Sequence, residues 1–486
     1  MTSPLPILLH CAEGLKSQVQ YVLDTLLMAA GVPVVYVDQP PSHGMYVVYG
    51  AQPFESLAPG RSLAIAHFEK AWAFFDGEQP FPPAPASVDR LRLAFPTRAE
   101  GFDPTNDIGV DLLANAFYFL SSWWERVATG GTGLRQLYSN SAFVRLAMPR
   151  DIVDQYLERL VSRLNGLCER TGSPPWPAAT WPGDHRYALV LSHDVDFIPY
   201  GLADNLMQGA KTVMRHLVRQ RDLPDAWRAA RGLLRALAKG RDPYGCLPGI
   251  IAREQAAGVR SSIQVAVGHR HPNDVNYRIG DDQIRDYLRV IVDSGFDLCL
   301  HGSYLSTQNS EWYVEEVALL AGRLQRPQGS RQHFLSFNYD ALFGVQEACG
   351  IEYDMSMGYP DEVGPRCGFS YPYFPYNLKA DRPYDVLQIS LVLMDVTLRS
   401  YLGHRPEQAW PVIERQLADL QAKGGGTSVV WHPIVFAGAR DPGYGDLFWR
   451  MVDEVKRTGG LATDGRTVNA HWRDRARTCE SFRRGA

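Results

Sequence analysis

The sequence predicts an α/β protein built from two domains, a smaller α/β domain over residues 1–180 and a larger one over residues 181–486. Three observations support this prediction. Short apolar runs alternate with segments of helical period along most of the chain. Residues 187–192 form a continuous apolar run, which is typical of a strand buried on both faces of a parallel sheet or barrel. Residues 171–183 are rich in Pro and Gly, as interdomain linkers are.

The first domain begins with a predicted strand over residues 7–9. A helix follows, because apolar residues recur at helical spacing between positions 19 and 27, and Gly31 ends it. Further strands are predicted over residues 34–37 and 45–48, and further helices over 103–126 and 152–167. The linker that follows places the domain boundary near residue 180.

The second domain contains a series of short apolar runs with helical segments between them, and we expect each run to be a strand of one parallel sheet. The runs cover residues 187–192, 262–267, 296–300, 334–337, 386–394 and 428–431. Several of them stop at a residue that can titrate or bind a metal ion. Because sites in parallel α/β folds are built at the carboxyl ends of the strands, we expect the functional residues there.

Composition excludes several classes of protein. The chain has 486 residues, a formal charge of -4 and a pI of about 6.4, so it lacks the basic excess of a nucleic-acid-binding protein. Its seven cysteines form no C-x-x-C pair, which favours reduced thiols. No uncharged apolar run approaches the roughly 20 residues of a membrane helix. The N-terminus also lacks a basic signal-peptide region, and we therefore expect a cytoplasmic protein.

Four short segments carry residues suited to chemistry. Asp194 and Asp196 follow the run 187–192, and strand alternation places both carboxylates on one side of the chain. Such residues also commonly cap helices, so this segment alone leaves a structural role open. His301 ends a second run and is followed by Gly302, which permits a sharp turn or the close approach of a ligand.

The other two segments add a cation and two more imidazoles. Arg331 could hold a carboxylate through two hydrogen bonds, and His333 could complete a metal shell. His432 follows a buried run beside the aromatic Trp431. Each signal is weak alone, since a single strand-end histidine is usually structural. Together they supply the ligands, base and acid that a mononuclear metal hydrolase needs.

The order of these segments resembles the polysaccharide deacetylases of the NodB-homology type, similar to carbohydrate esterase family 4. The resemblance covers roughly residues 186–475, and residues 350–356 match the Gly-x-x-Tyr-Asp-x-Ser stretch of that family closely. This chain resembles a divergent branch with His-Asp-Val-Asp in place of Thr-Phe-Asp-Asp. The resemblance implies a deformed (β/α) barrel for residues 181–486. Residues 114–121 resemble an uncharacterised module that precedes this branch in bacterial proteins.

The resemblance also implies roles for individual residues. Asp194 takes the place of the general base, Arg331 that of the arginine that orients it, and His432 that of the general acid. Asp196 and His301 take the places of metal ligands. The family's second histidine of motif two falls on Leu305, which cannot bind a metal ion, and we infer that His333 replaces it.

These assignments predict a hydrolase that removes an N-acyl group, acetyl or formyl, from a sugar or glycan precursor in bacterial surface polysaccharide biosynthesis. One divalent ion is expected on Asp196, His301 and His333. Zinc is the first choice, and cobalt or nickel suit the same ligands. The predicted substrate-binding residues are Ser303, Tyr304, Trp431 and Arg366. Arg366 is assigned to an anionic group of the substrate, or alternatively to a pair with Asp361 or Glu362.

Two other classes of function remain open at this stage. Leu305 stands where the family has a metal-binding histidine, which favours a carbohydrate-binding relative of these deacetylases that has no metal ion and no catalytic turnover. A hydrolase of another small amide on the same scaffold is the second alternative. Residues 1–180 supply no nameable catalytic residue, and the sequence indicates no protein partner.

Overall fold

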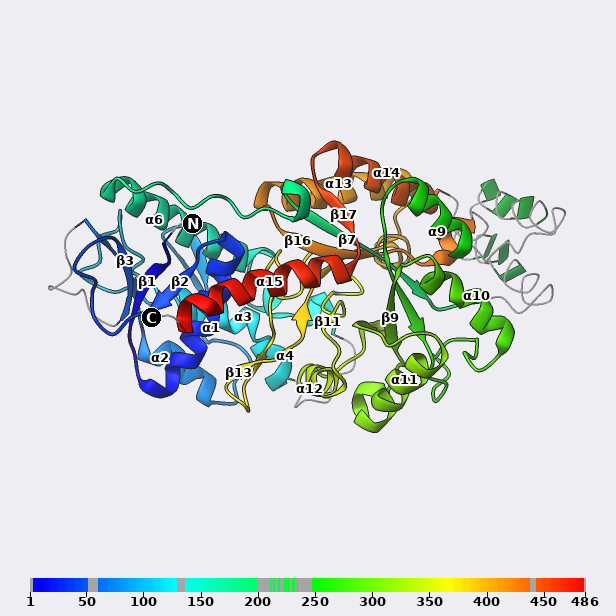
Figure 1. Ribbon diagram of the computed structural model, residues 1–486, viewed down its shortest axis with the longest axis horizontal. Helices are drawn as coiled ribbons and strands as arrows, with labels where there is room; N and C mark the ends of the chain where they lie inside the picture. The colour runs from blue at the N-terminus through cyan, green and yellow to red at the C-terminus, as the bar shows by residue number, and fades with distance from the viewer. Residues whose placement is uncertain are drawn as a thin grey trace.

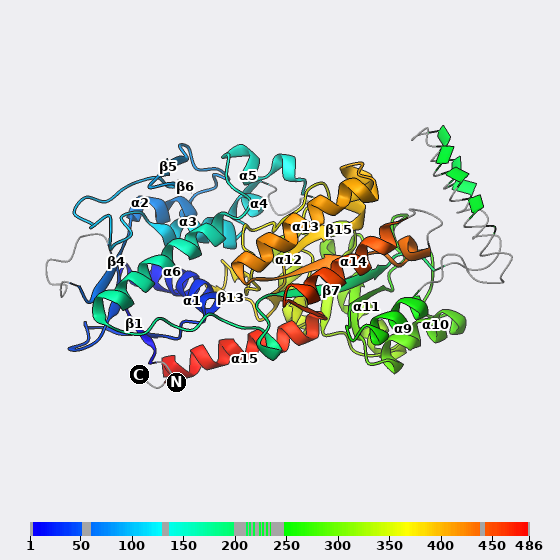
Figure 2. The same ribbon diagram turned by 90° about the horizontal axis from the view of Figure 1, so that it is seen from above.

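The computed structural model describes residues 3–50, 60–128, 136–198, 247–437 and 443–484, with isolated positions between 210 and 234. Two lobes lie side by side along the long axis of the molecule (Figure 1). We call residues 3–171 the N-terminal lobe and residues 186–464 the C-terminal lobe. The last helix, α15 (Gly465–Arg484), runs from the second lobe back along the first, and both chain ends lie there (Figures 1 and 2).

The N-terminal lobe is built on a four-stranded parallel sheet with the strand order β2-β1-β3-β4. Its strands are β1 (Leu5–His10), β2 (Val34–Tyr36), β3 (Tyr46–Gly50) and β4 (Ser62–Ala66). Helix α1 (Lys16–Ala30) joins β1 to β2 and ends where the sequence predicts. Gly31 takes a left-handed conformation there (φ 73°), which glycine adopts without steric cost.

The remaining helices of this lobe cover one face of the sheet and the edge towards the second lobe (Figure 2). They are α2 (Glu69–Trp72), α3 (Leu112–Leu120), α4 (Trp123–Ala128), α5 (Ala142–Arg145) and α6 (Ile152–Thr171), with a small hairpin of β5 (Ala86–Val88) and β6 (Leu91–Leu93). The prediction of one helix over residues 103–126 is wrong. Asp111 caps α3 by accepting a hydrogen bond from Ala114 N, and Ser122 (φ 50°) separates α3 from α4.

The C-terminal lobe is a parallel sheet of nine strands that curls towards a closed (β/α) barrel. The segment 387–394 pairs at its start with β11 and at its end with β16, which bends the sheet round. The strands are β7 (Ala188–Val195), β8 (Ser262–Ala266), β9 (Asp297–Gly302), β10 (Gly329–Gln332), β11 (Tyr353–Asp354), β14 (Leu387–Gln388), β15 (Leu391–Met394), β16 (Gly426–Val430) and β17 (Leu461–Thr463).

Helices separate most of these strands along the chain, as parallel pairing requires. They are α9 (Leu247–Ala256), α10 (Asp282–Asp293), α11 (Ser310–Arg323), α12 (Tyr339–Cys349), α13 (Pro406–Lys423) and α14 (Tyr444–Arg457). Residues 355–386, between β11 and β14, contain no helix, only the hairpin of β12 (Tyr376–Asn377) and β13 (Arg382–Pro383).

The predicted strand over residues 334–337 is wrong. The strand of this part of the sheet is β10, five residues earlier, and its Ser330, Arg331 and Gln332 are buried polar residues. Residues 333–335 form a single 3-10 turn in which Phe334 (φ 59°) and Leu335 (φ 54°) both lie in the left-handed region. The turn therefore directs His333 and Phe334 beyond the carboxyl end of β10.

The largest apolar core extends through both lobes. It combines residues of α1, α3 and α6 with Tyr371, Leu387 and Ile389 of the C-terminal lobe and with Trp472 of α15. Trp181, in the segment that joins the lobes, stacks on Trp472 with ring centroids 5.6 Å apart and donates its Nε1 hydrogen to the Gly424 carbonyl. The two lobes thus bury apolar surface against each other.

Two sequence expectations concern thiols and membranes. The cysteines whose side chains are described, Cys11, Cys168, Cys299, Cys349 and Cys367, carry free thiols. Among the helices of the described residues, none has the length and apolar character needed to span a bilayer.

Candidate metal centre and catalytic residues

The carboxyl ends of four parallel strands bring the candidate residues together. β7 runs to Val195, so Asp194 lies within the strand and Asp196 directly after it, on the same side. β9 carries His301 next to its last residue, and His333 follows β10. β16 ends at Val430, two residues before His432. The alternation of strands and helices therefore places distant parts of the chain at one edge of the sheet.

Asp196, His301 and His333 form a cluster that could hold a metal ion. Their potential ligand atoms all lie within 4.8 Å of one another. Asp196 Oδ1 is 3.2 Å from His301 Nε2 and 3.6 Å from His333 Nε2. The Asp196 side chain is 33% exposed, so the cluster is open to solvent on one side.

The chemistry of this cluster fits a divalent ion. Asp196 Oδ1 and His301 Nε2 are buried atoms without a hydrogen-bond partner, an arrangement that costs free energy unless something else binds them. The His301 Nδ1 atom lies 2.9 Å from the Arg331 carbonyl, a contact that directs Nε2 into the cluster. Two imidazole nitrogens and one carboxylate oxygen are a common ligand set for catalytic zinc.

Asp194 is held by a buried arginine. Arg331 NH1 donates to Asp194 Oδ1 at 2.5 Å, while Arg331 NH2 donates to Ser192 Oγ at 2.8 Å. The third nitrogen, Nε, donates to the Met355 carbonyl at 3.0 Å. Arg331 is fully buried and its guanidinium is fixed on three sides, so it sets the direction in which the second oxygen of Asp194 points. That oxygen lies 3.8 Å from His301 Nε2.

His432 lies between two carboxylates. Its Nδ1 is 2.6 Å from Asp395 Oδ1, and its Nε2 is 3.3 Å from Asp196 Oδ2. The sequence did not lead us to predict Asp395, although a signal was present. Asp395 follows the apolar run 386–394, just as Asp194 follows the apolar run 187–192. Arg399 Nε lies 3.6 Å from the other oxygen of Asp395.

These contacts shift the protonation of the site in a consistent direction. Burial lowers the pKa of His432, but the Asp395 and Asp196 carboxylates outweigh it and raise the pKa well above 6.5. Burial raises the pKa of Asp196, but the His333 imidazole and the close approach of His301 and His432 hold it well below its usual range. The carboxylates therefore stay charged and His432 holds its proton at neutral pH.

His193, the first residue of the His-Asp-Val-Asp segment, points away from this cluster. It is fully buried, with Nδ1 2.6 Å from the Trp431 carbonyl and Nε2 2.9 Å from Glu254 Oε1. Glu254 in turn accepts a hydrogen bond from Ser261 Oγ at 2.7 Å. His193 thus ties the end of β7 to the residue that precedes His432.

Two of the predicted substrate-binding residues, Ser303 and Tyr304, form hydrogen bonds with other protein groups near the cluster. Ser303 donates both its backbone N–H and its hydroxyl to Glu316, at 3.0 and 2.5 Å. The Tyr304 N–H donates to Asp274 Oδ1 at 2.9 Å. The Tyr304 ring stacks on His271 at 4.6 Å and packs edge-on to Phe334, which is 40% exposed. Leu305 is half-buried before a 3-10 turn.

The other two predicted substrate residues are buried in the protein interior. Trp431 is fully buried and donates its Nε1 hydrogen to the Tyr444 carbonyl at 2.8 Å, so its ring faces no solvent. Arg366 is 1% exposed and forms a two-pronged ion pair with Glu125 of the N-terminal lobe, at 2.8 and 2.7 Å. Its expected partners, an anionic substrate group or Asp361 and Glu362, are replaced by a carboxylate 241 positions earlier.

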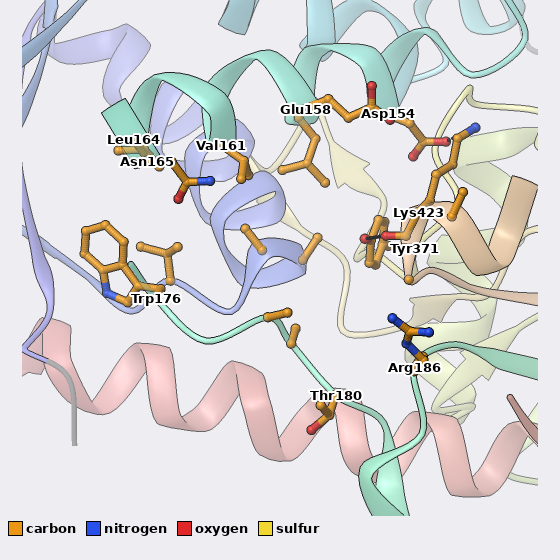
Figure 3. A pocket seen from close by; sticks show the side chains of 18 of the residues that line it. Asp154, Glu158, Val161, Leu164, Asn165, Trp176, Thr180, Arg186, Tyr371 and Lys423 are labelled. Carbon is orange, nitrogen blue, oxygen red and sulfur yellow. Dashed lines mark hydrogen bonds and ion pairs between the residues drawn. The ribbon is translucent and has the colours of Figure 1, made fainter. Parts of the chain in front are cut away.

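A cavity lies elsewhere, between the lobes (Figure 3). It has a volume of about 520 Å³, and α6, the joining segment and the end of α13 line it. Its buried carboxylate, Asp154, accepts hydrogen bonds from Ser370 and pairs with Lys423 at 3.1 Å. None of the clustered residues lines this cavity, and its buried polar groups are paired with each other.

Comparison with known proteins finds similarity in solved structures only. No protein-family model matches the chain, and no curated protein matches it. One solved structure, described as "putative polysaccharide deacetylase from Mycobacterium smegmatis", is 15% identical, with a TM-score of 0.41 and coverage of 62% of this chain and 95% of that one. Another, described as Puue allantoinase, is 16% identical, with a TM-score of 0.39 and coverage of 60% and 92%. TM-scores this low assign neither family nor activity.

Proposed function

We propose that this protein is a metal-dependent hydrolase that removes an N-acyl group, acetyl or formyl, from a sugar or glycan precursor. One observation carries the proposal: a His/Asp cluster, an arginine-held carboxylate and a carboxylate-held histidine meet at the carboxyl edge of one sheet. Amide hydrolysis needs these three parts, namely an electrophilic centre, a base and an acid.

Asp196, His301 and His333 would hold the divalent ion, for which zinc is our first choice. The chemistry that such an ion supplies is Lewis-acid activation of an attacking water and of the amide carbonyl. The partnerless Asp196 Oδ1 and His301 Nε2 support this placement, because a bound cation would satisfy both atoms. The same two atoms argue against a metal-free carbohydrate-binding protein, because without a cation they would stay without a partner.

The protein's own residues would move the protons. Asp194, charged and oriented by Arg331, would accept the proton of the attacking water. His432, kept protonated by Asp395, would donate a proton from Nε2 to the departing amine nitrogen. His432 Nε2 and the second oxygen of Asp194 both lie beside the cluster, Nε2 3.3 Å from Asp196 and the oxygen 3.8 Å from His301.

The choice of a sugar substrate, and a role in bacterial surface polysaccharide biosynthesis, rest on the order of the sequence motifs. The half-exposed Phe334 beside His333 supports a ligand with an apolar face, such as a pyranose ring, at the open side of the cluster. A small amide without such a face would gain nothing from this ring.

Two measurements test the proposal. Purified protein should bind one zinc ion, and should release free amine from at least one member of a panel of N-acetylated and N-formylated sugars. Asp196→Ala should lose both properties, whereas Asp282→Asn, whose side chain is 80% exposed, should lose neither. Zinc binding that survives Asp196→Ala would contradict the assigned centre. Hydrolysis confined to ureido or peptide amides would replace the sugar with another small amide.

A further inference from the structure

The lobes are joined by a buried ion pair that packs against the segment after His333. Glu125 of α4 and Arg366 of the C-terminal lobe are 5% and 1% exposed and meet through two parallel hydrogen bonds of 2.8 and 2.7 Å. Breaking a buried pair of this kind by removing one partner leaves an uncompensated charge and is strongly destabilising locally. The pair therefore fixes the position of whatever packs against it.

The residues that pack against this pair belong to the segment after His333. The Arg366 guanidinium lies over the Phe337 ring, 4.7 Å from its centroid, and Arg366 NH1 donates to the Gly358 carbonyl at 3.2 Å. The next residue of α4, Arg126, repeats the arrangement. It lies 4.5 Å over the Tyr339 ring and forms an ion pair with Asp340. Helix α4 thus holds residues 337–340 from the N-terminal lobe.

The turn between His333 and Phe337 depends on such support. Phe334 and Leu335 are consecutive non-glycine residues with left-handed backbones, a conformation that is sterically unfavourable for a residue with a Cβ atom. A conformation of this kind persists only where surrounding contacts hold it. At one end the turn continues from β10, and the Leu335 side chain packs into a small apolar cluster. At the other end the turn is held by Phe337, beneath Arg366.

We propose that Glu125 and Arg366 are positioning residues for the metal centre, and that the N-terminal lobe contributes to this centre by holding His333 in place. The inference rests on the proposed function, since it assumes that His333 is a ligand. Neither residue touches the cluster itself. Their effect passes through Phe337 and the strained turn to the imidazole of His333.

A second ion pair between the lobes provides a matched control. Lys423 of α13 pairs with the buried Asp154 of α6 at 3.1 Å, and both residues line the inter-lobe cavity rather than the cluster. If the lobes mattered only for general stability, breaking either pair would have a similar effect. If Glu125 and Arg366 position His333, only the first pair will influence metal binding.

The experiment measures zinc affinity by calorimetric titration of the full-length protein with zinc alone. Glu125→Gln should weaken zinc binding about 10-fold, the lower end of the effect of residues that support metal ligands. Asp154→Asn should bind zinc as the wild type does. With cobalt in place of zinc, the visible ligand-field spectrum should change in Glu125→Gln and stay unchanged in Asp154→Asn. Arg366→Lys, which keeps the charge but loses the two-pronged contact, should fall between wild type and Glu125→Gln.

Equal zinc affinity in wild type and Glu125→Gln, or equal weakening by Glu125→Gln and Asp154→Asn, would overturn the inference. Should Glu125→Gln fail to fold, as judged by circular dichroism, Asp340→Asn provides the same test, because it removes the half-exposed partner of Arg126 and should also weaken zinc binding. Failure of the proposed function gives a different result: the wild type itself would bind no zinc, or Asp196→Ala would bind it normally.

Discussion

Asp395 shows how a single side chain can set the chemistry of its neighbour. It is fully buried, and its contact with His432 Nδ1 leaves only Nε2 facing the cluster. Burial raises the pKa of Asp395, but the His432 imidazole outweighs it and lowers the pKa. The pair is therefore a carboxylate and an imidazolium, which is the state that a proton donor requires.

We expect Asp395→Asn to lower kcat by roughly 10²-fold, the lower end of what a positioned acid contributes. Metal content should not change. His432 must be protonated to act, so activity is lost as the pH rises through its pKa. Removing the Asp395 charge lowers that pKa, and the alkaline limb of the pH–rate profile should therefore move to lower pH. An alkaline limb that stays in place would contradict His432 as the acid.

Individual site residues were predictable from sequence to different degrees. Asp194 and Asp196 could be placed on one side of the chain because strand alternation has a fixed period. Arg331 could be assigned to a carboxylate because a guanidinium offers two parallel donors, and to Asp194 because of the family resemblance. Arg366 could not be placed, since its partner Glu125 lies in the other lobe and no local pattern encodes a contact across 241 positions. The partner of Ser303 could not be predicted either, because Glu316 lies 13 positions later on α11.

At the scale of elements, the sequence predicts strands correctly where they are apolar. It fails to predict strands in which polar residues of the site take the place of apolar ones. β10 consists of Gly, Ser, Arg and Gln, and its side chains are buried because Arg331 and Gln332 find polar partners inside the lobe. The apolar run that follows it belongs to the turn around His333. α3 began later than predicted because Thr105 N donates to Asp103 Oδ1 in a tight turn, which residue periodicity does not detect.

The cap of α3 leads to a prediction about pH and stability. Asp111 is buried and accepts hydrogen bonds from Phe68 N, Trp72 Nε1 and Tyr49 OH. Burial raises its pKa from 3.8 to about 7 despite these hydrogen bonds. The folded state then binds the proton more tightly than the unfolded state, so the contribution to stability is complete below 3.8 and is lost as the pH rises through about 7.

Urea unfolding at about pH 5 and about pH 8 checks this. The wild-type free energy of unfolding should fall between the two values by more than that of Asp111→Asn, which has no such proton to lose. Asp282→Asn, on the surface, should show the wild-type pH dependence. Identical pH dependence in all three proteins would show that Asp111 titrates normally in the fold.

At the scale of the whole molecule, the lobes depend on one core. Residues 355–386 contribute no helix to cover the sheet beside β14, and α1, α3 and α6 of the N-terminal lobe share the apolar cluster of Leu387 and Ile389. The alternation of strands and helices predicted the α/β class and a parallel sheet, and the family resemblance implied its barrel form. This alternation could not predict the shared core. A buried strand has the same apolar pattern whether a helix of its own lobe or of the other lobe covers it.

We therefore expect residues 181–486 produced alone to be insoluble or to lack fixed tertiary packing, as near-ultraviolet circular dichroism would show. The physical reason is that this fragment would expose the apolar surface that α1, α3 and α6 cover in the full chain. Residues 1–177 and 178–486, divided at an exposed part of the joining segment and produced together, should assemble and regain the spectrum of the intact protein. A folded, monomeric barrel fragment would contradict the shared core.

Helix α15 gives the order of synthesis a structural meaning. It follows every other described element along the chain, yet its Gly465 N–H binds Ser262 of the sheet and its Trp472 enters the core of both lobes. While the ribosome is still making this helix, neither lobe has its final partner. Packing of the shared core can therefore be complete only after α15 has been translated. Until then both lobes of the nascent protein expose apolar surface, which makes the nascent protein prone to aggregate.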